Sequence, residues 1–430
     1  MTDDVVVIGG GVAGLVAARD LSEQGVGVTL VEARDRLGGR TWTRPLAGTD
    51  VMVEMGGTWF SRTLQPAIAE EIARYGLRVS EGGRFERVVW AGTDGRHEGT
   101  TIDGTFGPLF EPARAALDAA VVEVEHAYAQ GPRVPRHLDV PAADWIDALD
   151  VPRPTKEMLL SWVAVMGGGD PREISVLMLT SDLALTGFQV ESSLEELGES
   201  FTDGTEALVT AIAAGVGGLI RLGISVTSVT EIDGAVAVSS ADGARFLADA
   251  AVVALPLNCL GDVAFDPLLP DALGRAAREG QVGRSTKVLA VADGFGPSTI
   301  GATWGHPLQN AMGMRTVEGG TLVVGFDGVG ALDDPHDTAE VEAALRVIEP
   351  EAHVVACDSH DWIGDPFSKG TWSSWPPGWG SSNIAGKLGR PRGRVAFAGS
   401  DTAVDGGGYI EGAITSGRQA AIDVMEALRR

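Results

Sequence analysis

Short apolar runs and a glycine turn alternate at the start of the chain. Residues Val5 to Ile8 form a fully apolar, β-branched run, which is typical of a buried parallel strand. An apolar-periodic helix is predicted from Ala13 to about Gln24, and a second strand is predicted in the stretch VGVTLVEA, which reaches Glu32. The order strand, glycine turn, helix, strand predicts a βαβ unit.

Further along, the pattern changes and later returns. Residues 53–77 predict a strand, a glycine turn and a helix, whereas residues from about 80 to 201 are rich in amphipathic helical stretches such as EPARAALDAAVVEVEHAYAQ. A helix in FTDGTEALVTAIAAGV is followed by a predicted meander of strands, IRLGISVTSVTEID, AVAVSSADG and ARFLADAAVVALPL. Residues from about 285 to 387 do not continue this pattern. After them, RVAFAGSDTA predicts a last buried strand. Two interleaved domains are therefore predicted.

The turn after the first strand carries the pattern Gly-x-Gly-x-x-Gly. Gly9 permits a tight turn, Gly11 lets the backbone approach a pyrophosphate, and Gly14 allows close packing of the helix. Glu32, which lies 18 residues after the last glycine, can accept hydrogen bonds from ribose hydroxyls. Its charge would repel a 2′-phosphate and so disfavours NADP. The sequence therefore predicts a dinucleotide site.

Composition and charge narrow the class of protein. The chain has 430 residues, of which 44% are apolar and 21% charged, as in ordinary globular proteins. The net charge of −26 and the lack of a basic block argue against nucleic acid and anionic membranes as partners. Without a signal peptide or a long apolar stretch, the protein is expected to be cytoplasmic. Cys259 and Cys357 are far apart and the histidines are scattered, so neither a disulfide framework nor a metal site is expected.

The stretch EARDRLGGRTWT, which begins at Glu32, resembles the E-A-x-x-R-x-G-G-R motif of glutathione-reductase-like flavoproteins and, more narrowly, of the flavin-containing monoamine oxidase family. The resemblance runs through LDVPRPTKEMLLSW, HDWIGDPF, GRVAFAGSD and GYIEGA, and within the family it is strongest to the bacterial 6-hydroxynicotine oxidases. It implies an α/β fold with FAD as cofactor, in which a Rossmann-like FAD-binding domain of glutathione-reductase type is interleaved with an α+β substrate domain. The implied segments are 1–79, 202–284 and 388–430 for the FAD-binding domain, and 80–201 and 285–387 for the substrate-binding domain.

The same resemblance extends the cofactor site. In the family, a G-G-x turn lies against the flavin ring, and the helix that follows the glycine run DGGGY meets the pyrimidine end of the flavin with its backbone N–H groups. Arg34, Arg36 and Arg40 are placed to reach phosphate or ribityl oxygens, although a solvated surface position is the favoured alternative for Arg36. The expected cofactor contacts are Gly9, Gly11, Val12, Ala13, Gly14, Glu32, Ala33, Arg34, Gly39, Arg40, Gly56, Gly57, Thr58, Val226, Trp362, Asp401, Gly408 and Ile410. Thr371 stands where covalently flavinylated members carry a cysteine, so non-covalent FAD is expected.

Lys287 lies in the strand-like stretch TKVLAVA, where period-2 alternation puts it on one face with Leu289 and Val291. A lysine on an apolar strand face either lies at a sheet edge, with its amine in water, or is held at a site. Spacing alone leaves both alternatives open. Members of the family carry a lysine in the matching strand, where a water bridges its amine to flavin N5, and this implies a catalytic role.

Four tryptophans, Trp362, Trp372, Trp375 and Trp379, fall within 18 residues of irregular, glycine- and proline-rich chain. For Trp375 and Trp379, burial at a domain seam is an equal alternative to a role in a site. By resemblance, Trp372 and Tyr409 form two parallel aromatic walls in front of the flavin. These walls would orient a neutral amine with its α C–H bond toward N5, so both residues are expected to be catalytic.

The substrate pocket departs from the hydroxynicotine oxidase pattern. Val165 stands where those enzymes carry an asparagine, and the position of one of their tyrosines falls around Gln309 and Asn310. Both differences argue against the same substrate. The expected substrate-binding residues are Trp59, Val165, Met166, Gln309, Trp372 and Tyr409.

The resemblance implies an FAD-dependent amine oxidase. Hydride would pass from the α-carbon of a small-molecule amine to flavin N5, the imine would hydrolyse to an aldehyde or ketone, and O₂ would reoxidise the flavin to give H₂O₂. A flavin amine dehydrogenase with a protein electron acceptor, a carotenoid-type flavin desaturase and a non-enzymatic flavin-binding protein remain alternatives. Whether the protein forms a homodimer is left open by the sequence.

Overall fold

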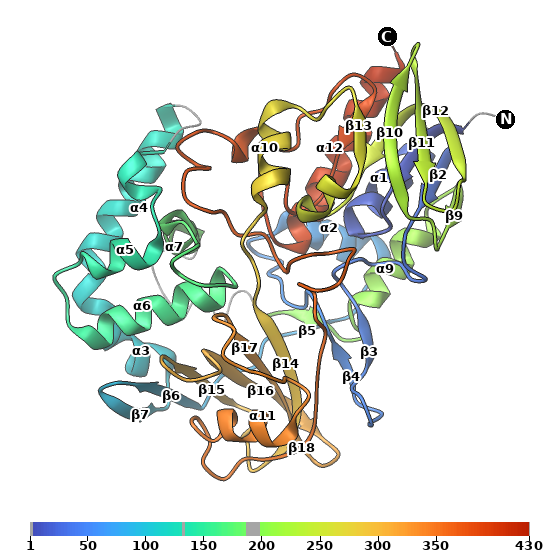
Figure 1. The fold of residues 1–430 in the computed structure, drawn as a ribbon. Coiled ribbons are helices and arrows are strands. Elements are labelled where there is room, and N and C mark those ends of the chain that lie inside the picture. Colours follow the sequence, from blue (N-terminus) through green and yellow to red (C-terminus); the bar gives the residue numbers. More distant parts are fainter. Residues whose placement is uncertain (1–2, 131–133, 186–197, 430) are drawn as a thin grey trace.

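The computed structural model describes residues 3–130, 134–185 and 198–429, and these residues form two large β-sheets with helices around them (Figure 1). The first sheet has the strand order β13-β10-β11-β12-β1-β2-β9, with β19 paired to β12. Its strands are β1 (Asp3–Ile8), β2 (Val28–Val31), β9 (Leu219–Arg221), β10 (Val226–Ile232), β11 (Ala235–Ser240), β12 (Arg245–Val253), β13 (Ala264–Asp266) and β19 (Val395–Phe397). The second sheet has the order β18-β14-β17-β16-β15-β6-β7. Its strands are β6 (Arg87–Gly92), β7 (Gly95–Gly99), β14 (Thr286–Asp293), β15 (Thr299–Thr303), β16 (Asn310–Val317), β17 (Gly320–Asp327) and β18 (His353–Ser359).

The helices form separate groups beside the two sheets (Figure 1). With the first sheet lie α1 (Val12–Glu23), α2 (Pro66–Tyr75), α9 (Thr205–Ala214), α10 (Asp271–Glu279) and α12 (Ile410–Leu428). With the second lie α3 (Ile102–Phe110), α4 (Arg114–Gln130), α5 (Ala142–Asp147), α6 (Arg153–Met166), α7 (Val176–Leu185) and α11 (Thr338–Leu345). Two short ladders pair β3 (Thr43–Pro45) with β4 (Met52–Glu54), and β5 (Val79–Ser80) with β8 (Ser200–Phe201). Among the described residues, no helix is long and apolar enough to cross a membrane.

The predicted βαβ unit is present at the start of the first sheet. Strands β1 and β2 pair in parallel, and α1 begins and ends within one residue of the predicted bounds. Strands β12, β19 and β9 extend this parallel sheet, so their carboxyl ends lie at the same edge. The antiparallel order β10-β11-β12 is the predicted meander. Ligands bind at the carboxyl edge of such sheets, so a ligand site is expected at that edge.

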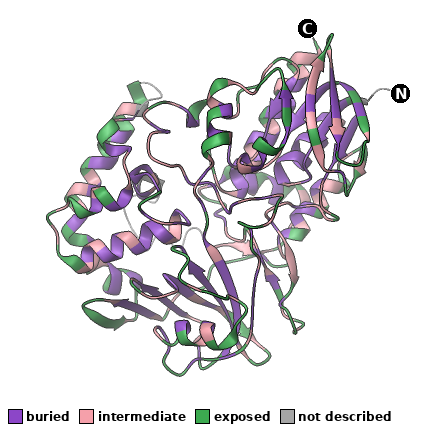
Figure 2. Cartoon of the chain, viewed as in Figure 1, coloured by how far each residue is buried: buried purple, intermediate pink, exposed green. Residues whose placement is uncertain are grey.

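Helix α12 packs on α1 because small residues let the two backbones approach. A Cβ atom on Gly417 would lie 2.4 Å from the carbonyl oxygen of Ala13, so only glycine fits at this crossing. Figure 2 shows the strands and helices of this domain buried along their shared faces. The packing fixes the N-terminus of α12 beside the glycine turn that opens α1.

The second sheet buries both of its faces. Val288 and Ala290 of β14 pack with Val323 on the face that α11 covers. Leu289 and Phe326 lie on the opposite face, in a cluster that includes Val53 of β4. This second face is the one that the predicted alternation assigns to Lys287.

The segment before β8 contains more than the predicted helices. Strands β6 and β7 form a hairpin, and β6 joins the second sheet by pairing in parallel with β15. The turn signal TDG between VVWAG and RHEG is the local sequence cue for this hairpin. The strands of the first sheet fall within 1–79, 202–284 and 388–430, and those of the second within 80–201 and 285–387, while the domain boundaries themselves stay a prediction.

Candidate active site

A cavity of about 540 Å³ lies between the two sheets. It is lined by the glycine turn before α1, by the chain on both sides of the β3–β4 ladder, by the N-terminus of α12 and by one face of the second sheet. The cavity therefore joins the predicted dinucleotide site to the face that carries Lys287. Most residues predicted for the cofactor and the substrate line this one space.

Two glycine turns face each other at one end of the cavity. Gly9 has a positive φ of 107°, and a Cβ atom there would lie 2.6 Å from the carbonyl oxygen of Ala254. A Cβ atom on Gly14 would lie 2.0 Å from the oxygen of Gly9, so α1 can pack this tightly only with glycine. Gly39 approaches Gly11 so closely that a Cβ atom on it would lie 3.2 Å from the Cα atom of Gly11. Bare backbone therefore forms this end of the cavity.

The carboxylate of Glu32 lies at the carboxyl end of β2. Its Oε2 atom accepts a hydrogen bond from the backbone N–H of Gly10 at 2.6 Å, and its Oε1 atom accepts one from the N–H of Arg34 at 2.8 Å. Glu32 is buried and lines the cavity. A carboxylate accepts up to about four hydrogen bonds, so these two leave capacity for the hydroxyls of a ligand.

The three arginines after β2 have different partners. Arg34 forms an ion pair with Asp365 at 2.8 Å, and Arg40 forms one with Asp401 at 2.8 Å. Both arginines line the cavity. The solvated position favoured for Arg36 is wrong: its guanidinium donates to three backbone carbonyls of the same turn, and it stacks 4.4 Å from the ring centroid of Trp42. Burial lowers the pKa of Arg36 to about 10.

Lys287 is held by the turn that follows β4. Its Nζ atom donates to the carbonyl oxygens of Glu54 at 2.7 Å and Gly56 at 3.0 Å, and to Oγ1 of Thr58 at 2.7 Å. The amine also lies 4.9 Å from the ring centroid of Trp59. The side chain is only 6% exposed, so of the two alternatives the sheet-edge position is wrong. Burial lowers the pKa of Lys287 to about 7, although the carboxylate of Glu54 acts in the opposite direction.

Aromatic side chains line the part of the cavity next to Lys287. Phe326 connects two of them, with its ring centroid 5.9 Å from that of Trp59 and 5.8 Å from that of Trp372. Trp372 donates from Nε1 to the carbonyl oxygen of Met166 at 2.9 Å, which ties its loop to the end of α6. Tyr409 also lines this part of the cavity, from the position that precedes α12. The structure thus places Trp372 and Tyr409 in one space, as walls of the same cavity.

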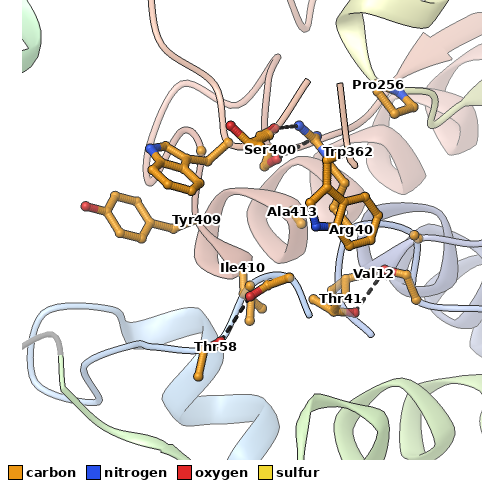
Figure 3. A pocket seen from close by; sticks show the side chains of 18 of the residues that line it. Val12, Arg40, Thr41, Thr58, Pro256, Trp362, Ser400, Tyr409, Ile410 and Ala413 are labelled. Carbon is orange, nitrogen blue, oxygen red and sulfur yellow. Dashed lines mark hydrogen bonds between the residues drawn. The ribbon is translucent and has the colours of Figure 1, made fainter. Parts of the chain in front are cut away.

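The N-terminus of α12 faces the cavity through Tyr409 and Ile410 (Figure 3). Gly408 precedes them with a positive φ of 82°, which a non-glycine residue would rarely adopt. Glu411 of the first turn does not face the cavity, since its carboxylate accepts from the backbone N–H groups of Ala67 and Ile68. The carboxylate thereby provides acceptors for two free N–H groups in the first turn of α2 and fixes α12 in place.

Most of the predicted cofactor residues line the cavity, and two do not. Gly14 and Asp401 lie behind it: Gly14 packs against Gly9, and Asp401 accepts from the N–H of Leu257 while pairing with Arg40. The predicted cofactor residues that line it are Gly9, Gly11, Val12, Ala13, Glu32, Ala33, Arg34, Gly39, Arg40, Gly56, Gly57, Thr58, Val226, Trp362, Gly408 and Ile410. Trp362 donates from Nε1 to the carbonyl oxygen of Met55, which places its ring against the turn before Gly56.

The substrate residues need one correction. Trp59, Val165 and Met166 line the cavity, but Gln309 does not. Gln309 is buried away from it, where its amide donates to the carbonyl of His306 and accepts from the N–H of Gly328. The next residue, Asn310, lines the cavity instead, because successive side chains of a strand point to opposite faces. Sequence reasoning also missed Phe85, Met178, Met312, Met314 and Phe326. Period-2 alternation along β16 and β17 was an available signal for Met312, Met314 and Phe326, whereas Phe85 before β6 and Met178 in α7 had none.

The chemistry of the lining fits the FAD that the sequence implies. Bare backbone at the two glycine turns leaves room for a pyrophosphate, and the hydroxyls of Thr371 and Ser373 are buried with no hydrogen-bond partner among the described residues. Both residues line the cavity, where a polar cofactor would offer their hydroxyls a partner. Cys259 also lines it, but burial raises the pKa of its thiol to about 12 and keeps it protonated. In the described part of the chain, no cluster of three or more His, Cys, Asp or Glu side chains could hold a metal ion.

Comparisons with known proteins match nearly the whole chain. The sequence profile described as flavin containing amine oxidoreductase matches residues 12–425. The chain is 32% identical to pseudooxynicotine dehydrogenase of a Pseudomonas species over 99% of its own length and 87% of that protein. It is 31% identical to (S)-6-hydroxynicotine oxidase of Paenarthrobacter nicotinovorans over 99% of its own length and 100% of that protein.

Solved structures show the same fold. Putrescine oxidase bound to putrescine superposes with a TM-score of 0.84 at 22% identity, with 99% of each chain covered. Cyclohexylamine oxidase from Brevibacterium oxydans superposes with a TM-score of 0.84 at 23% identity, with 100% of each chain covered. The predicted α/β amine oxidase architecture is thereby confirmed.

Proposed function

This chain belongs to the family of flavin containing amine oxidoreductases, with FAD as the cofactor, and we propose that it is an amine oxidase. The proposed net reaction converts an amine, water and O₂ into an aldehyde or ketone, ammonia or a smaller amine, and H₂O₂. FAD, when bound, would supply the two-electron acceptor for the hydride that leaves the amine α-carbon. The remaining tasks fall to the protein, which must bind and orient the amine and keep water from the reacting carbon.

The single observation that carries this proposal is the position of Lys287. Its amine is buried at the junction of the two parts of the cavity, between the glycine turn of residues 56–58 and the aromatic walls. Nothing in the packing of an apolar sheet face requires a lysine there, and burying its charge is costly. We therefore assign Lys287 to the reacting centre rather than to the stability of the fold.

For the cofactor, we propose that the backbone of the Gly9–Gly14 turn receives the pyrophosphate at the N-terminus of α1. Glu32 would accept hydrogen bonds from ribose hydroxyls, and the backbone of Val226 would contact the adenine end. The N–H of Ile410, at the N-terminus of α12, would stabilise negative charge on the flavin ring. Asp401 and Gly14 would act indirectly, by holding Arg40 and α1 in place.

For the substrate, we propose that Trp372 and Tyr409 orient a neutral amine between their rings. Neutral amines suit this part of the cavity because its lining is largely aromatic and methionine-rich. No side chain is needed as a general base when the amine binds in its neutral form, which leaves orientation and exclusion of water as the contribution of these walls.

A second candidate function is kept because of the relatives. Two of the similar proteins are named dehydrogenases, pseudooxynicotine dehydrogenase and, at 29% identity, nicotine dehydrogenase of Pseudomonas putida. In a dehydrogenase, the electrons would pass to a protein acceptor in place of O₂. The site residues described above serve either acceptor.

The experiment is an anaerobic panel of amines mixed with the FAD-loaded protein. The proposed function expects that at least one amine bleaches the flavin absorbance and that air then restores it with formation of one H₂O₂ per amine. Bleaching with slow recovery in air would support the dehydrogenase, and no bleaching by any amine would contradict both. Acid precipitation of the same protein should release the FAD into the supernatant, as expected for non-covalent binding.

A further inference from the structure

Asn310 lies in a row of side chains that crosses three strands of the second sheet. Lys287 of β14 is directly opposite Phe326 of β17, and Phe326 is directly opposite Asn310 of β16. Directly opposed residues share a face of the sheet, so all three point to the same side. All three line the cavity. Adjacent strands are about 4.8 Å apart, which puts Asn310 about 10 Å from Lys287, on the far side of the Phe326 ring.

The side-chain oxygen of Asn310 has no hydrogen-bond partner among the residues that the structure describes. Asn310 is 5% exposed, and its Oδ1 atom is buried with no hydrogen bond to the described residues. The neighbouring Gln309 shows the contrast, because both ends of its amide are hydrogen-bonded to backbone. A buried polar atom without a partner costs stability and in native proteins is commonly satisfied by a ligand or water. Its position on the cavity wall indicates that the partner comes from the cavity.

The surroundings of Asn310 restrict what that partner can be. The described lining residues on this side of the cavity are mainly apolar and include Phe85, Met178, Met312 and Met314. Among the described lining residues of the second sheet and its helices, none carries a carboxylate. A second ammonium group at this end of a substrate would therefore lack a counter-charge, whereas a neutral hydrogen-bond donor would suit the amide oxygen.

We propose that Asn310 recognises a neutral hydroxyl or N–H group at the end of the substrate opposite to the oxidised amine. The substrate class is then a monoamine with an apolar body and a distal hydrogen-bond donor, and diamines are disfavoured. The proposal rests on the proposed amine oxidation, since Lys287 marks the reacting end. Asn310 takes no part in the chemical step, so it determines specificity through binding.

The test compares matched pairs of amines with the FAD-loaded protein. Tyramine and phenethylamine differ only in the distal hydroxyl, and ω-amino alcohols, alkylamines and α,ω-diamines of equal chain length give a second, length-graded set. Rates of anaerobic flavin bleaching are measured for the natural protein, for Asn310→Leu and for the control Met312→Leu, which changes the next residue on the same face of β16. FAD content and thermal midpoint report whether each variant is folded.

We expect at least about a tenfold preference for the hydroxylated amine at one chain length, because one neutral hydrogen bond at a desolvated site is worth about that factor. Asn310→Leu should abolish the preference while Met312→Leu keeps it. Equal preferences in the natural protein and Asn310→Leu would overturn the proposal. If Asn310→Leu does not fold, the same rates are measured for Asn310→Asp. A shift of the substrate preference toward the diamine supports the role of Asn310, and an unchanged preference overturns it.

Binding without turnover separates this proposal from the proposed function. The probes 4-ethylphenol and ethylbenzene lack the amine, and their dissociation constants are measured from perturbation of the flavin absorbance. Tighter binding of the phenol that is lost in Asn310→Leu supports the role of Asn310, even where no amine bleaches the flavin. Bleaching by amines without any phenol preference would instead leave the proposed function standing and contradict the role of Asn310.

Discussion

The Nζ atom of Lys287 lies 2.7 Å from Oγ1 of Thr58, which joins the second sheet to the glycine turn of residues 56–58. The same amine donates to two backbone carbonyls of the chain just before Thr58. Lys287 therefore links the substrate side of the cavity to the turn proposed to meet the flavin. The first two predictions follow from this contact.

Replacement of Lys287 by methionine should leave FAD bound and slow the flavin half-reactions. Methionine matches the lysine side chain as far as Cε and lacks only the terminal amine, so the fold and the FAD content should persist. Loss of one positioned polar group at a reacting centre costs about 10²-fold in rate. Stopped-flow measurement of flavin reduction by an amine, and of reoxidation by O₂, checks this. Unchanged rates in both half-reactions would remove Lys287 from the reacting centre.

The buried lysine should also make stability depend on pH. Burial lowers the pKa of Lys287 to about 7, whereas the unfolded chain has the ordinary value of 10.5. Between these values the unfolded chain binds a proton that the folded protein does not, so stability rises with pH across this window and the penalty is complete below about pH 7. The unfolding free energy relative to Lys287→Met should therefore rise between pH 7 and 10, by on the order of 1 kcal/mol per pH unit. Urea unfolding at several pH values measures the difference, and a constant difference would contradict the low pKa.

Truncation of Tyr409 should weaken catalysis, whereas removal of its hydroxyl should matter little. Tyr409→Phe keeps the ring that lines the cavity, and Tyr409→Ala removes it. An aromatic wall is worth about 0.5–1.5 kcal/mol, so the alanine variant should lose about 3- to 10-fold in kcat/KM. Steady-state kinetics with one amine compares the two. A loss of equal size in Tyr409→Phe would mean that the hydroxyl, and not the ring, carries the effect.

Replacement of Glu32 by glutamine should weaken FAD binding. The carboxylate already accepts two backbone hydrogen bonds at 2.6 and 2.8 Å, and a neutral amide keeps only one acceptor oxygen. Hydrogen bonds to a charged group are worth about 1.5–3 kcal/mol, so FAD should bind about 10- to 100-fold more weakly. Reconstitution of the FAD-free protein, followed by flavin fluorescence, measures the dissociation constant. The control Glu318→Gln changes an exposed carboxylate in the β16–β17 turn and should leave the constant unchanged.

A buried ion cluster beneath α12 should dominate the stability of the first domain. Glu71 of α2 accepts hydrogen bonds from Arg19 of α1 and Arg418 of α12, and its side chain is fully buried. Burial raises the pKa of Glu71, but the two arginines outweigh it and hold the pKa below its usual value. Glu71→Gln should cost on the order of 3 kcal/mol, because it removes the buried counter-charge that Arg19 shares with Arg418 and leaves Arg19 paired only with the partly exposed Asp20. Urea unfolding at pH 7 measures this cost.

The adjacent Glu70 provides the control for that variant. Its carboxylate pairs with Arg418 but is 66% exposed, so Glu70→Gln should cost less than about 1 kcal/mol. The pH dependence of the Glu71 contribution also has a definite sign. Because its pKa is lowered in the folded protein, the Glu71 carboxylate stabilises the fold above its unfolded pKa of 4.5, and this contribution is lost as the pH falls. Equal losses in Glu70→Gln and Glu71→Gln would contradict the role of the buried cluster.

The sequence by itself determined the local elements of this protein. The apolar run of β1, the glycine turn and the periodic helix placed α1 within one residue and the two strands within two residues of their observed ends, because strand burial and helix amphipathicity are patterns of neighbouring residues. Alternation along β14 likewise assigned Lys287 to the face of Leu289. The resemblance of its motifs was enough to identify the family, as the comparisons confirmed.

Only the tertiary structure decided which side chains meet. The partners of Lys287 come from residues 54–58, more than 200 positions earlier in the chain, and no local pattern reports such a contact. The choice between Gln309 and Asn310 depends on a shift of one residue, and such a shift moves a side chain from the core to the cavity. The same holds for Arg36. A charged side chain in a turn is predicted to be solvated, and only the structure shows the backbone carbonyls that surround it. Periodicity fixes the face of an element, whereas long-range packing and register fix what that face touches.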